Sequence, residues 1–291
     1  MEFSTPESIM HVLHSPQEIF PPLDFARRNG ARIGFVPTMG ALHEGHLSLV
    51  RRAKSECDVA VVSIFVNPTQ FAPTEDLSKY PRTLDADLDL LRSLSTDYVF
   101  VPNPAQVYPS GFSTYVDPAQ VALPLEGVFR PTHFRGVATV VLKLFHMIPS
   151  DAAYFGRKDY QQLAVIRKMV EDLDVPIRII GCETVREQDG LAMSSRNRYL
   201  QPAERYQALA LWRALNLAKG LAAQGERQVT TLERVMEEEL RRSQIQTIDY
   251  ARVVDPDSLQ TLEQVTDRAV ALIAARVGTT RLIDNLDLEV T

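Results

Sequence analysis

Residues 39–46 (MGALHEGH) place two histidines, His43 and His46, three positions apart in a glycine-containing segment. Imidazoles at i and i+3 share one face of a helix start, where N–H groups and the helix dipole favour an anion such as phosphate. Gly45 lets such a ligand approach the backbone closely. The spacing differs from the H-E-x-x-H of zinc hydrolases and no third ligand is obvious, which leaves phosphate contact or a plain pair of surface histidines.

Two further segments carry groups that bind phosphate. In residues 193–196 (MSSR) two serine hydroxyls stand beside an arginine, whose planar fork suits phosphate oxygens. In residues 156–162 (GRKDYQQ) Lys158 supplies a point charge and Asp159 suits a helix N-cap. An ordinary polar loop and a capped helix with solvated charges are the respective alternatives.

Alternating strands and helices position these segments. An apolar run at 32–37 ends just before the histidines, and an amphipathic helix is expected at about 46–56. Further strands are predicted at 59–66, 97–101, 152–155 and 177–180, and helices at 16–28, 83–94, 133–148 and 160–173. This alternation predicts an α/β fold with a doubly wound, Rossmann-like parallel sheet, in which ligands bind outside the carboxyl ends of the strands.

The pattern changes after about residue 183. Two helices are expected at 202–223 and 230–242, followed by strand-like runs at 247–254, 269–277 and 280–284. Helices followed by strands, without alternation, indicate a smaller α+β domain. We therefore expect a catalytic domain over 1–183 and a second domain over 184–291 that closes over the active site. One further strand, around 114–116, is expected within the Pro-rich segment 102–131.

Composition narrows the class of protein. The 291 residues are 45% hydrophobic with a net charge of −6, which disfavours non-specific binding to nucleic acid. No window approaches the roughly 18 apolar residues of a membrane span, and the first ten residues lack a basic, apolar secretory signal. Two cysteines fit a reducing compartment. A cytoplasmic enzyme without a membrane or nucleic-acid partner is expected.

Six segments together resemble the pantothenate synthetase family, the AMP-forming pantoate–β-alanine ligases of the HxGH nucleotidyltransferase superfamily, which also contains class I aminoacyl-tRNA synthetases. They are PTMGALHEGH (37–46), FVNPTQF (65–71), YPRT (80–83), HFRGVATV (133–140), FGRKDYQQ (155–162) and DGLAMSSRN (189–197). They follow the family's order over about residues 31–200. The last ninety residues are similar to the family only in length and general pattern.

The resemblance implies a reaction in two steps. ATP activates the carboxylate of (R)-pantoate as an acyl-adenylate with release of pyrophosphate, and the amine of β-alanine then displaces AMP to give pantothenate, on the route to coenzyme A. It also implies ATP as a substrate with Mg²⁺, no tightly bound organic cofactor, and a homodimer. The alternatives are another nucleotidyltransferase of the superfamily that stops at a nucleotidylated product, and a catalytically silent nucleotide-binding protein.

Site residues are carried over position by position. The resemblance implies that His43 and His46 stabilise the phosphates, with His46 at the position of the proton donor, and that Gln70 borders both pantoate and β-alanine. Gln162 would hold pantoate. The implied catalytic set adds Lys158, Ser194, Ser195 and Arg196. The implied ATP site consists of Met39, Gly40, Ala41, Leu42, His43, Glu44, Gly45, His46, Gly156, Arg157, Lys158, Asp159, Val185, Met193, Ser194, Ser195 and Arg196.

Some features stay open or depart from the family. Arg157 stands where many relatives carry glutamate, which adds positive charge beside Lys158. No protein ligand for Mg²⁺ is assigned, because Asp85 and Asp87 lie at i and i+2 and do not share a helix face. Met193–Arg196 would correspond to the mobile KMSKS loop of the synthetases. The segment 102–131, with Glu126, Arg130 and nearby His133, is a candidate for excluding water from the adenylate.

Overall fold

The computed structural model describes residues 9–72 and 77–289. The chain divides into two compact units. The first runs up to Pro118 and also contains Thr132–Gly156 and Val165–Cys182; the second contains Ala119–Pro131, Arg157–Ala164 and everything from Glu183 onwards. The boundary at residue 183 for two functional domains stays a prediction.

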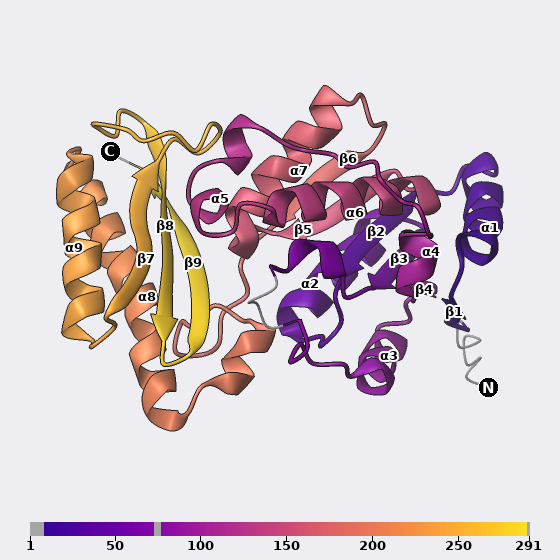
Figure 1. The fold of residues 1–291 in the computed structure, drawn as a ribbon, viewed down its shortest axis with the longest axis horizontal. Coiled ribbons are helices and arrows are strands. Elements are labelled where there is room, and N and C mark those ends of the chain that lie inside the picture. The colour runs from indigo at the N-terminus through magenta and orange to yellow at the C-terminus, as the bar shows by residue number, and fades with distance from the viewer. Residues whose placement is uncertain (1–8, 73–76, 290–291) are drawn as a thin grey trace, which may run out of the picture. The chain divides into compact units, whose positions relative to one another are not determined.

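The first unit is built on a six-stranded parallel sheet in the order β1-β4-β3-β2-β5-β6 (Figure 1). The strands are β1 (His11–Leu13), β2 (Ile33–Thr38), β3 (Val59–Ile64), β4 (Tyr98–Phe100), β5 (Ala152–Gly156) and β6 (Arg178–Cys182). The chain leaves β2 toward β3 on one side and returns to β5 on the other. The strand order therefore reverses at β2, and the expected doubly wound sheet is confirmed.

Helices pack on both faces of this sheet. They are α1 (Pro16–Arg28), α2 (Glu44–Glu56), α3 (Leu84–Ser93), α6 (His133–Met147) and α7 (Tyr160–Asp172), with a short helix α4 (Pro104–Val107). Val36 on β2 lies in one apolar cluster with residues of α2 and α3, whereas its neighbour Phe35 meets Phe145 of α6 edge to face. Successive strand residues point to opposite faces, so one strand anchors both helix layers.

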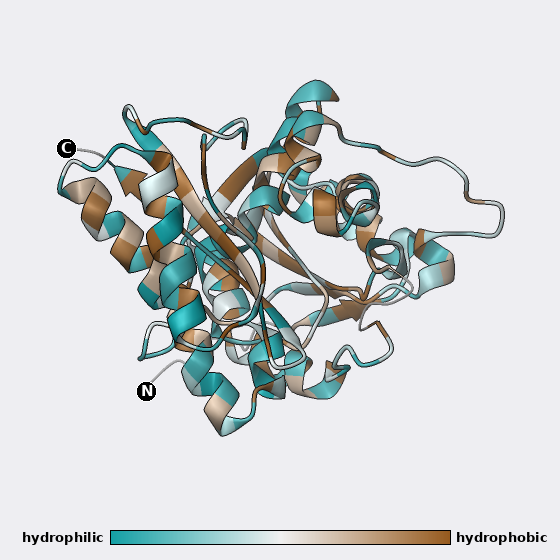
Figure 2. Cartoon of the chain, turned by 60° about the vertical axis from the view of Figure 1, so that its left-hand side comes forward, coloured by the Kyte–Doolittle hydropathy of each residue, from teal (hydrophilic) through white to brown (hydrophobic). Residues whose placement is uncertain are grey.

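The second unit contains a three-stranded antiparallel sheet, formed by β7 (Thr247–Val254), β8 (Arg268–Val277) and β9 (Thr280–Glu289). Helices α8 (Pro202–Ala223) and α9 (Val229–Arg242) share its apolar core, and both lie on one side of the sheet (Figure 1). In Figure 2 hydrophobic and hydrophilic residues alternate along the helices. The expected α+β character of this region is confirmed.

Short helical turns lie between these elements. They are η1 (Pro68–Gln70), η2 (Gln120–Ala122), α5 (Glu126–Phe129), η3 (Arg157–Asp159) and η4 (Ser195–Tyr199). The strand expected at 114–116 is wrong: the structure forms no strand there, and the backbone N–H of Val116 donates instead to the hydroxyl of Thr139. A side-chain acceptor thus takes the place of a neighbouring strand.

The last strand is longer than expected. It continues to Glu289, whereas the apolar pattern predicted an end at 284. Asp284, Asn285 and Asp287 break the pattern but still pair in register with β8. No helix in the described part of the chain is long and apolar enough to cross a membrane. Residues 1–8, which contribute to the expectation of no secretory signal, lie outside the described residues.

Candidate active site

The two histidines lie at the start of α2, directly after β2. His43 is the N-cap, and its Nδ1 accepts a hydrogen bond from the backbone N–H of Gly45 at 3.2 Å. His46 Nδ1 accepts from the backbone N–H of His43 at 3.4 Å, and the ring centroids are 4.1 Å apart. Because both Nδ1 atoms act as acceptors, each neutral ring carries its proton on Nε2. The helix start therefore orients two imidazole N–H donors.

The turn before these histidines has a strained backbone. Gly40 and Ala41 both have positive φ, 81° and 50°. A Cβ on Gly40 would lie 3.0 Å from a carboxylate oxygen of Asp87 and 3.1 Å from Ile64, so this position requires glycine. Alanine at positive φ persists only where its surroundings hold it there.

Asp87 of α3 provides that support. Its Oδ2 accepts from the N–H of Ala41 at 2.9 Å, and its Oδ1 accepts from the N–H of Leu42 at 2.8 Å. The Thr83 hydroxyl donates to the same carboxylate at 3.2 Å. Asp87 is only 2% exposed, so these bonds compensate the loss of its water shell.

Sequence reasoning missed this role of Asp87. The available signal is an acid on the buried stripe of a helix, next to Leu88 and four residues before Leu91. Such a carboxylate needs donors, and the N–H groups of a positive-φ turn supply them.

A second part of the first unit surrounds Gln70 with hydrogen bonds. Its side-chain oxygen accepts from the Asn67 amide at 3.1 Å, and its Nε2 lies 2.9 Å from the sulfur of Met39. His133 Nδ1 lies 2.9 Å from the Gln70 carbonyl. Tyr108 donates to Asn67 at 2.8 Å, and burial raises the pKa of this phenol, which keeps it neutral. Gln70 thus presents an oriented, uncharged amide beside Met39 of the histidine turn.

In the second unit, η3 carries the lysine expected to bind phosphate. The side chain of Lys158 is 17% exposed and lies 4.0 Å from the Asp159 carboxylate. Arg157 pairs with Glu183 at 3.0 Å and with Asp287. The side-chain amide of Asn285 donates to the carbonyls of Arg157 at 3.0 Å and Lys158 at 2.8 Å. These partners of the turn all belong to the second unit.

The serine–arginine loop follows a narrow hairpin. Arg186 and Ala192 form an antiparallel bridge, and the N–H of Met193 donates to the Val185 carbonyl at 3.0 Å. Ser194 then caps η4, its hydroxyl accepting from the N–H of Arg196 at 3.3 Å. The loop is therefore an ordered turn in this structure.

The segment containing Glu126 is held by buried charges. Glu126 is 6% exposed, accepts two hydrogen bonds from Arg281 at 2.7 and 2.8 Å, and accepts one from Tyr250 at 2.7 Å. Arg130 lies 3.8 Å away. Burial alone would raise the pKa of Glu126, but the hydrogen bonds and charge of Arg281 outweigh it and lower that pKa.

Gln161, the residue before Gln162, also holds the segment that contains Glu126. Gln161 donates to the carbonyls of Val121 and Pro124 at 2.9 and 2.7 Å and accepts from the N–H of Glu126. Gln162 follows it on α7 and is partly exposed. His133, grouped with Glu126 and Arg130 by sequence, lies instead in the first unit against Gln70.

The predicted residues fall into two groups. Met39–His46 and Gln70 lie in the first unit, together with Gly156 at the end of β5, the strand beside β2. The second unit holds Arg157, Lys158, Asp159, Gln162, Val185 and Met193–Arg196. That both groups bind one nucleotide stays a prediction. Among residues 9–72 and 77–289, no three or more His, Cys, Asp and Glu side chains gather as a metal site.

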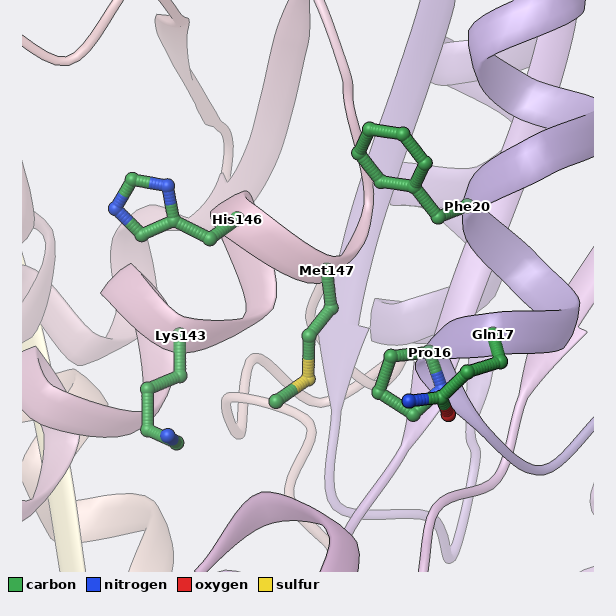
Figure 3. A pocket seen from close by; sticks show the side chains of 6 residues that line it. All are labelled: Pro16, Gln17, Phe20, Lys143, His146 and Met147. Atoms are coloured by element: carbon green, nitrogen blue, oxygen red, sulfur yellow. The ribbon is translucent and has the colours of Figure 1, made fainter.

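A separate hollow lies between α1 and α6 in the first unit (Figure 3). Its lining is mainly apolar and consists of Pro16, Gln17, Phe20, Lys143, His146 and Met147. None of the predicted site residues lines it, so it has no part in the expected chemistry.

Comparison with known proteins decides the family. The family model for pantoate–β-alanine ligase matches residues 11–287. The chain belongs to the pantoate–β-alanine ligase family. The ligase match extends into β9, well beyond residue 200, where the resemblance in the quoted segments ends.

Named relatives agree with this assignment. Pantothenate synthetase from Rhodopirellula baltica is 54% identical over 264 residues, covering 90% of this chain and 93% of the relative. The enzyme of that name from Thermotoga neapolitana is 49% identical over 276 residues, covering 95% and 99%.

Solved structures of the ligase family share the fold. Pantothenate synthetase from Thermus thermophilus superposes with a TM-score of 0.89 at 44% identity, covering 95% of this chain and 99% of that one. Pantoate–β-alanine ligase from Francisella tularensis, complexed with beta-gamma ATP and β-alanine, gives 0.75 at 35% identity, covering 96% and 97%.

The support of the histidine turn gives a first prediction. In Asp87→Asn only one side-chain oxygen remains to accept from the N–H groups of Ala41 and Leu42. The amide NH₂ that replaces the second oxygen is a donor, and it faces one of these N–H groups. Since a hydrogen bond to a charged group contributes about 1.5–3 kcal/mol, we expect the free energy of unfolding to fall by roughly 2–3 kcal/mol, together with slower adenylation. Urea denaturation and ATP–pyrophosphate exchange measure the two effects.

Asp85→Asn is the matched control, because Asp85 lies two residues earlier on the same helix and is exposed. We expect it to match the wild type in both measurements. Equal behaviour of the two variants would contradict the role assigned to Asp87.

The Glu126–Arg281 pair gives a prediction about pH. A glutamate in an unfolded chain titrates near pH 4.3, and the folded-state pKa of Glu126 is lower. Its carboxylate therefore stabilises the fold above about pH 4.3, and this contribution is lost as pH falls through the folded-state pKa. Denaturation curves of the wild type and Glu126→Gln should differ most near neutral pH and converge on acidification. A difference that does not change with pH would contradict this assignment.

Proposed function

We propose that this chain condenses (R)-pantoate with β-alanine to give pantothenate, using ATP and releasing AMP and pyrophosphate through a pantoyl-adenylate. The observation that carries the proposal is the anchored histidine pair at the carboxyl end of β2, in a chain that matches the ligase family over residues 11–287. The relative complexed with beta-gamma ATP and β-alanine supports two of the substrates.

In the first step the carboxylate of pantoate attacks the α-phosphorus of ATP, and pyrophosphate leaves. No protein nucleophile is needed. Negative charge shifts among the phosphate oxygens, and the Nε2–H groups of His43 and His46 would donate to them beside the N-terminus of α2. Donors held in advance in this way are each worth about 2.7–4 kcal/mol of barrier lowering.

Pantoate and β-alanine need groups of different character. Gln70, oriented by Asn67, would bind pantoate with an amide that both donates and accepts, and it would border the path of β-alanine. Gln162 would also hold pantoate. In the second step the β-alanine amine attacks the acyl carbon, the bond from that carbon to the phosphate oxygen of AMP breaks, and the nitrogen loses its proton to water as AMP leaves. Positioning of the two reactants supplies most of this acceleration, about 7–11 kcal/mol in favourable cases.

The second unit would contribute positive charge to the triphosphate. Lys158 and Arg196 would neutralise phosphate oxygens, Ser194 and Ser195 would donate to them, and Val185 would contact the nucleotide. Gly156, Arg157 and Asp159 complete this proposed set. Mg²⁺ enters as the counterion of ATP, held mainly by phosphate oxygens and water. Asp87 does not fit as its ligand, since both of its oxygens accept from backbone N–H groups.

We also propose a cytoplasmic homodimer whose partners are small molecules, with no tightly bound organic cofactor and no nucleic-acid or membrane partner. The net charge of −6 supports the absence of a nucleic-acid partner. Sedimentation at micromolar concentration would test the dimer.

Two substitutions test the chemistry. We expect His46→Ala and Lys158→Ala each to reduce pantoate-dependent ATP–pyrophosphate exchange at least tenfold, about 1.4 kcal/mol of lost transition-state stabilisation, with the fold unchanged as measured by circular dichroism. His146→Ala, in the hollow of Figure 3, and Lys168→Ala, on α7 in ion pairs with Glu171 and Asp172, serve as matched controls. Wild-type turnover in either test variant would show that the site is wrongly placed.

The product distinguishes this reaction from that of a related nucleotidyltransferase. Incubation with ATP, pantoate and β-alanine should release AMP at a rate that depends on the amine. A nucleotidylated product that accumulates with no effect of β-alanine would contradict the ligase reaction.

A further inference from the structure

Two adjacent polar residues, Asp284 and Asn285, lie buried in the middle of β9, at 3% and 7% exposure. Successive side chains of a strand point to opposite faces. On one face Asp284 lies among Leu282, Leu286 and Leu288, which belong to the core shared with α8. The two polar side chains can therefore bind two different segments of the second unit.

Asn285 binds the turn that carries Lys158. Its Nδ2 donates to the carbonyl of Arg157 at 3.0 Å and to the carbonyl of Lys158 at 2.8 Å. One amide thus fixes the two peptide planes that precede and follow the Lys158 Cα, and with them the direction in which its side chain leaves the backbone. Asp287, on the same face, adds the ion pair with Arg157.

Asp284 binds the hairpin that leads into the serine–arginine loop. Its carboxylate forms two hydrogen bonds with Arg186, at 2.7 and 2.9 Å. Arg186 also donates to the Gly190 carbonyl at 3.0 Å and lies 3.7 Å above the ring of Trp212. Gly190 has φ 97°, and a Cβ there would lie 2.2 Å from that ring. The hairpin therefore has one tightly fixed arrangement just before Met193.

We propose that Asp284 and Asn285 are positioning residues: through β9 they hold the Lys158 turn and the Arg186 hairpin in a fixed relation, so that Lys158 and Met193–Arg196 meet ATP together. The inference rests on the proposed roles of those residues in ATP binding. Its physical basis is that buried polar groups cost free energy unless they are bonded. Each side chain forms two hydrogen bonds to a segment that leads to or contains proposed ATP-binding residues.

Two substitutions of Asn285 separate positioning from simple space filling. Asn285→Asp keeps the shape but points carboxylate oxygens at two carbonyl oxygens, whereas Asn285→Ala removes the side chain. If Asn285 acts through its two N–H donors, Asn285→Asp is the more severe variant. If it only fills space, the isosteric Asn285→Asp is the milder one, and the inference is overturned. Asn216→Ala and Asn216→Asp, at an exposed position on α8, serve as controls.

The measurement is ATP–pyrophosphate exchange with the full-length protein. For Asn285→Ala we expect KM for ATP to rise about tenfold, within the hundredfold that a displacement of about 1 Å can cost. KM for β-alanine in the full reaction should change less than twofold, since β-alanine has no proposed contact with this turn. Equal changes in both KM values would indicate general loosening of the fold and would overturn the inference.

A double-mutant cycle tests whether Asn285 acts through Lys158. In the Lys158→Ala background, Asn285→Ala should reduce exchange by less than twofold further, because the side chain that it positions is already gone. Independent, multiplying effects would overturn the positioning role while leaving the proposed function intact. Failure of Lys158→Ala itself to slow exchange would instead contradict the proposed function, and the inference with it.

Asp284→Asn tests the other segment without relying on activity. It keeps the side-chain shape and removes the charge opposite Arg186. We expect amide hydrogen exchange across residues 186–196 to accelerate at least tenfold while that of the apolar strand β8 stays unchanged. Unchanged exchange across 186–196 would overturn the role of Asp284. If this variant fails to fold, the Asn285 variants still decide the proposal.

Discussion

The structure depends on one constraint: the two turns proposed to bind phosphate have backbone polar groups with no partner in a helix or sheet. Each such group must be bonded by something. Here side chains distant in sequence do so. Asp87 accepts from the N–H groups of Ala41 and Leu42, and Asn285 donates to the carbonyls of Arg157 and Lys158. A carboxylate suits the first turn and an amide the second, because one exposes donors and the other exposes acceptors.

The residues of the candidate site are divided between the two compact units, and this division indicates which segments would move together. The histidine turn and Gln70 belong to the unit of the parallel sheet, whereas Lys158 and Gln162 belong with Met193–Arg196. Buried bonds explain this grouping: Arg281 of β9 holds Glu126, and Gln161 holds the segment that contains it. The segments 119–131 and 157–164 are therefore expected to follow the second unit in any rearrangement on substrate binding.

Arg157 illustrates how local context changes the meaning of a substitution. Beside Lys158 an arginine in place of glutamate adds positive charge to a proposed phosphate site. The structure pairs it with the carboxylates of Glu183 and Asp287, and these groups raise the pKa of the guanidinium further although burial lowers it. Part of its charge is thus balanced within the second unit, and it also fastens the Lys158 turn to β9.

The sequence by itself determined the doubly wound sheet, the α+β region, the place of the histidines at a helix start and the family, because periodicity and dense motifs are local signals. It did not reveal Asp87 or Asn285 as supports, and it placed His133 with Glu126, whereas His133 contacts Gln70. It also ended the last strand before Asn285, since Asp284, Asn285 and Asp287 break the apolar pattern. The contacts of Asp87, His133 and Asn285 join residues that are separated in the sequence by 46, 63 and 127 positions, respectively. Only the tertiary structure decides them, because a buried polar side chain takes its role from the groups that the fold brings to it.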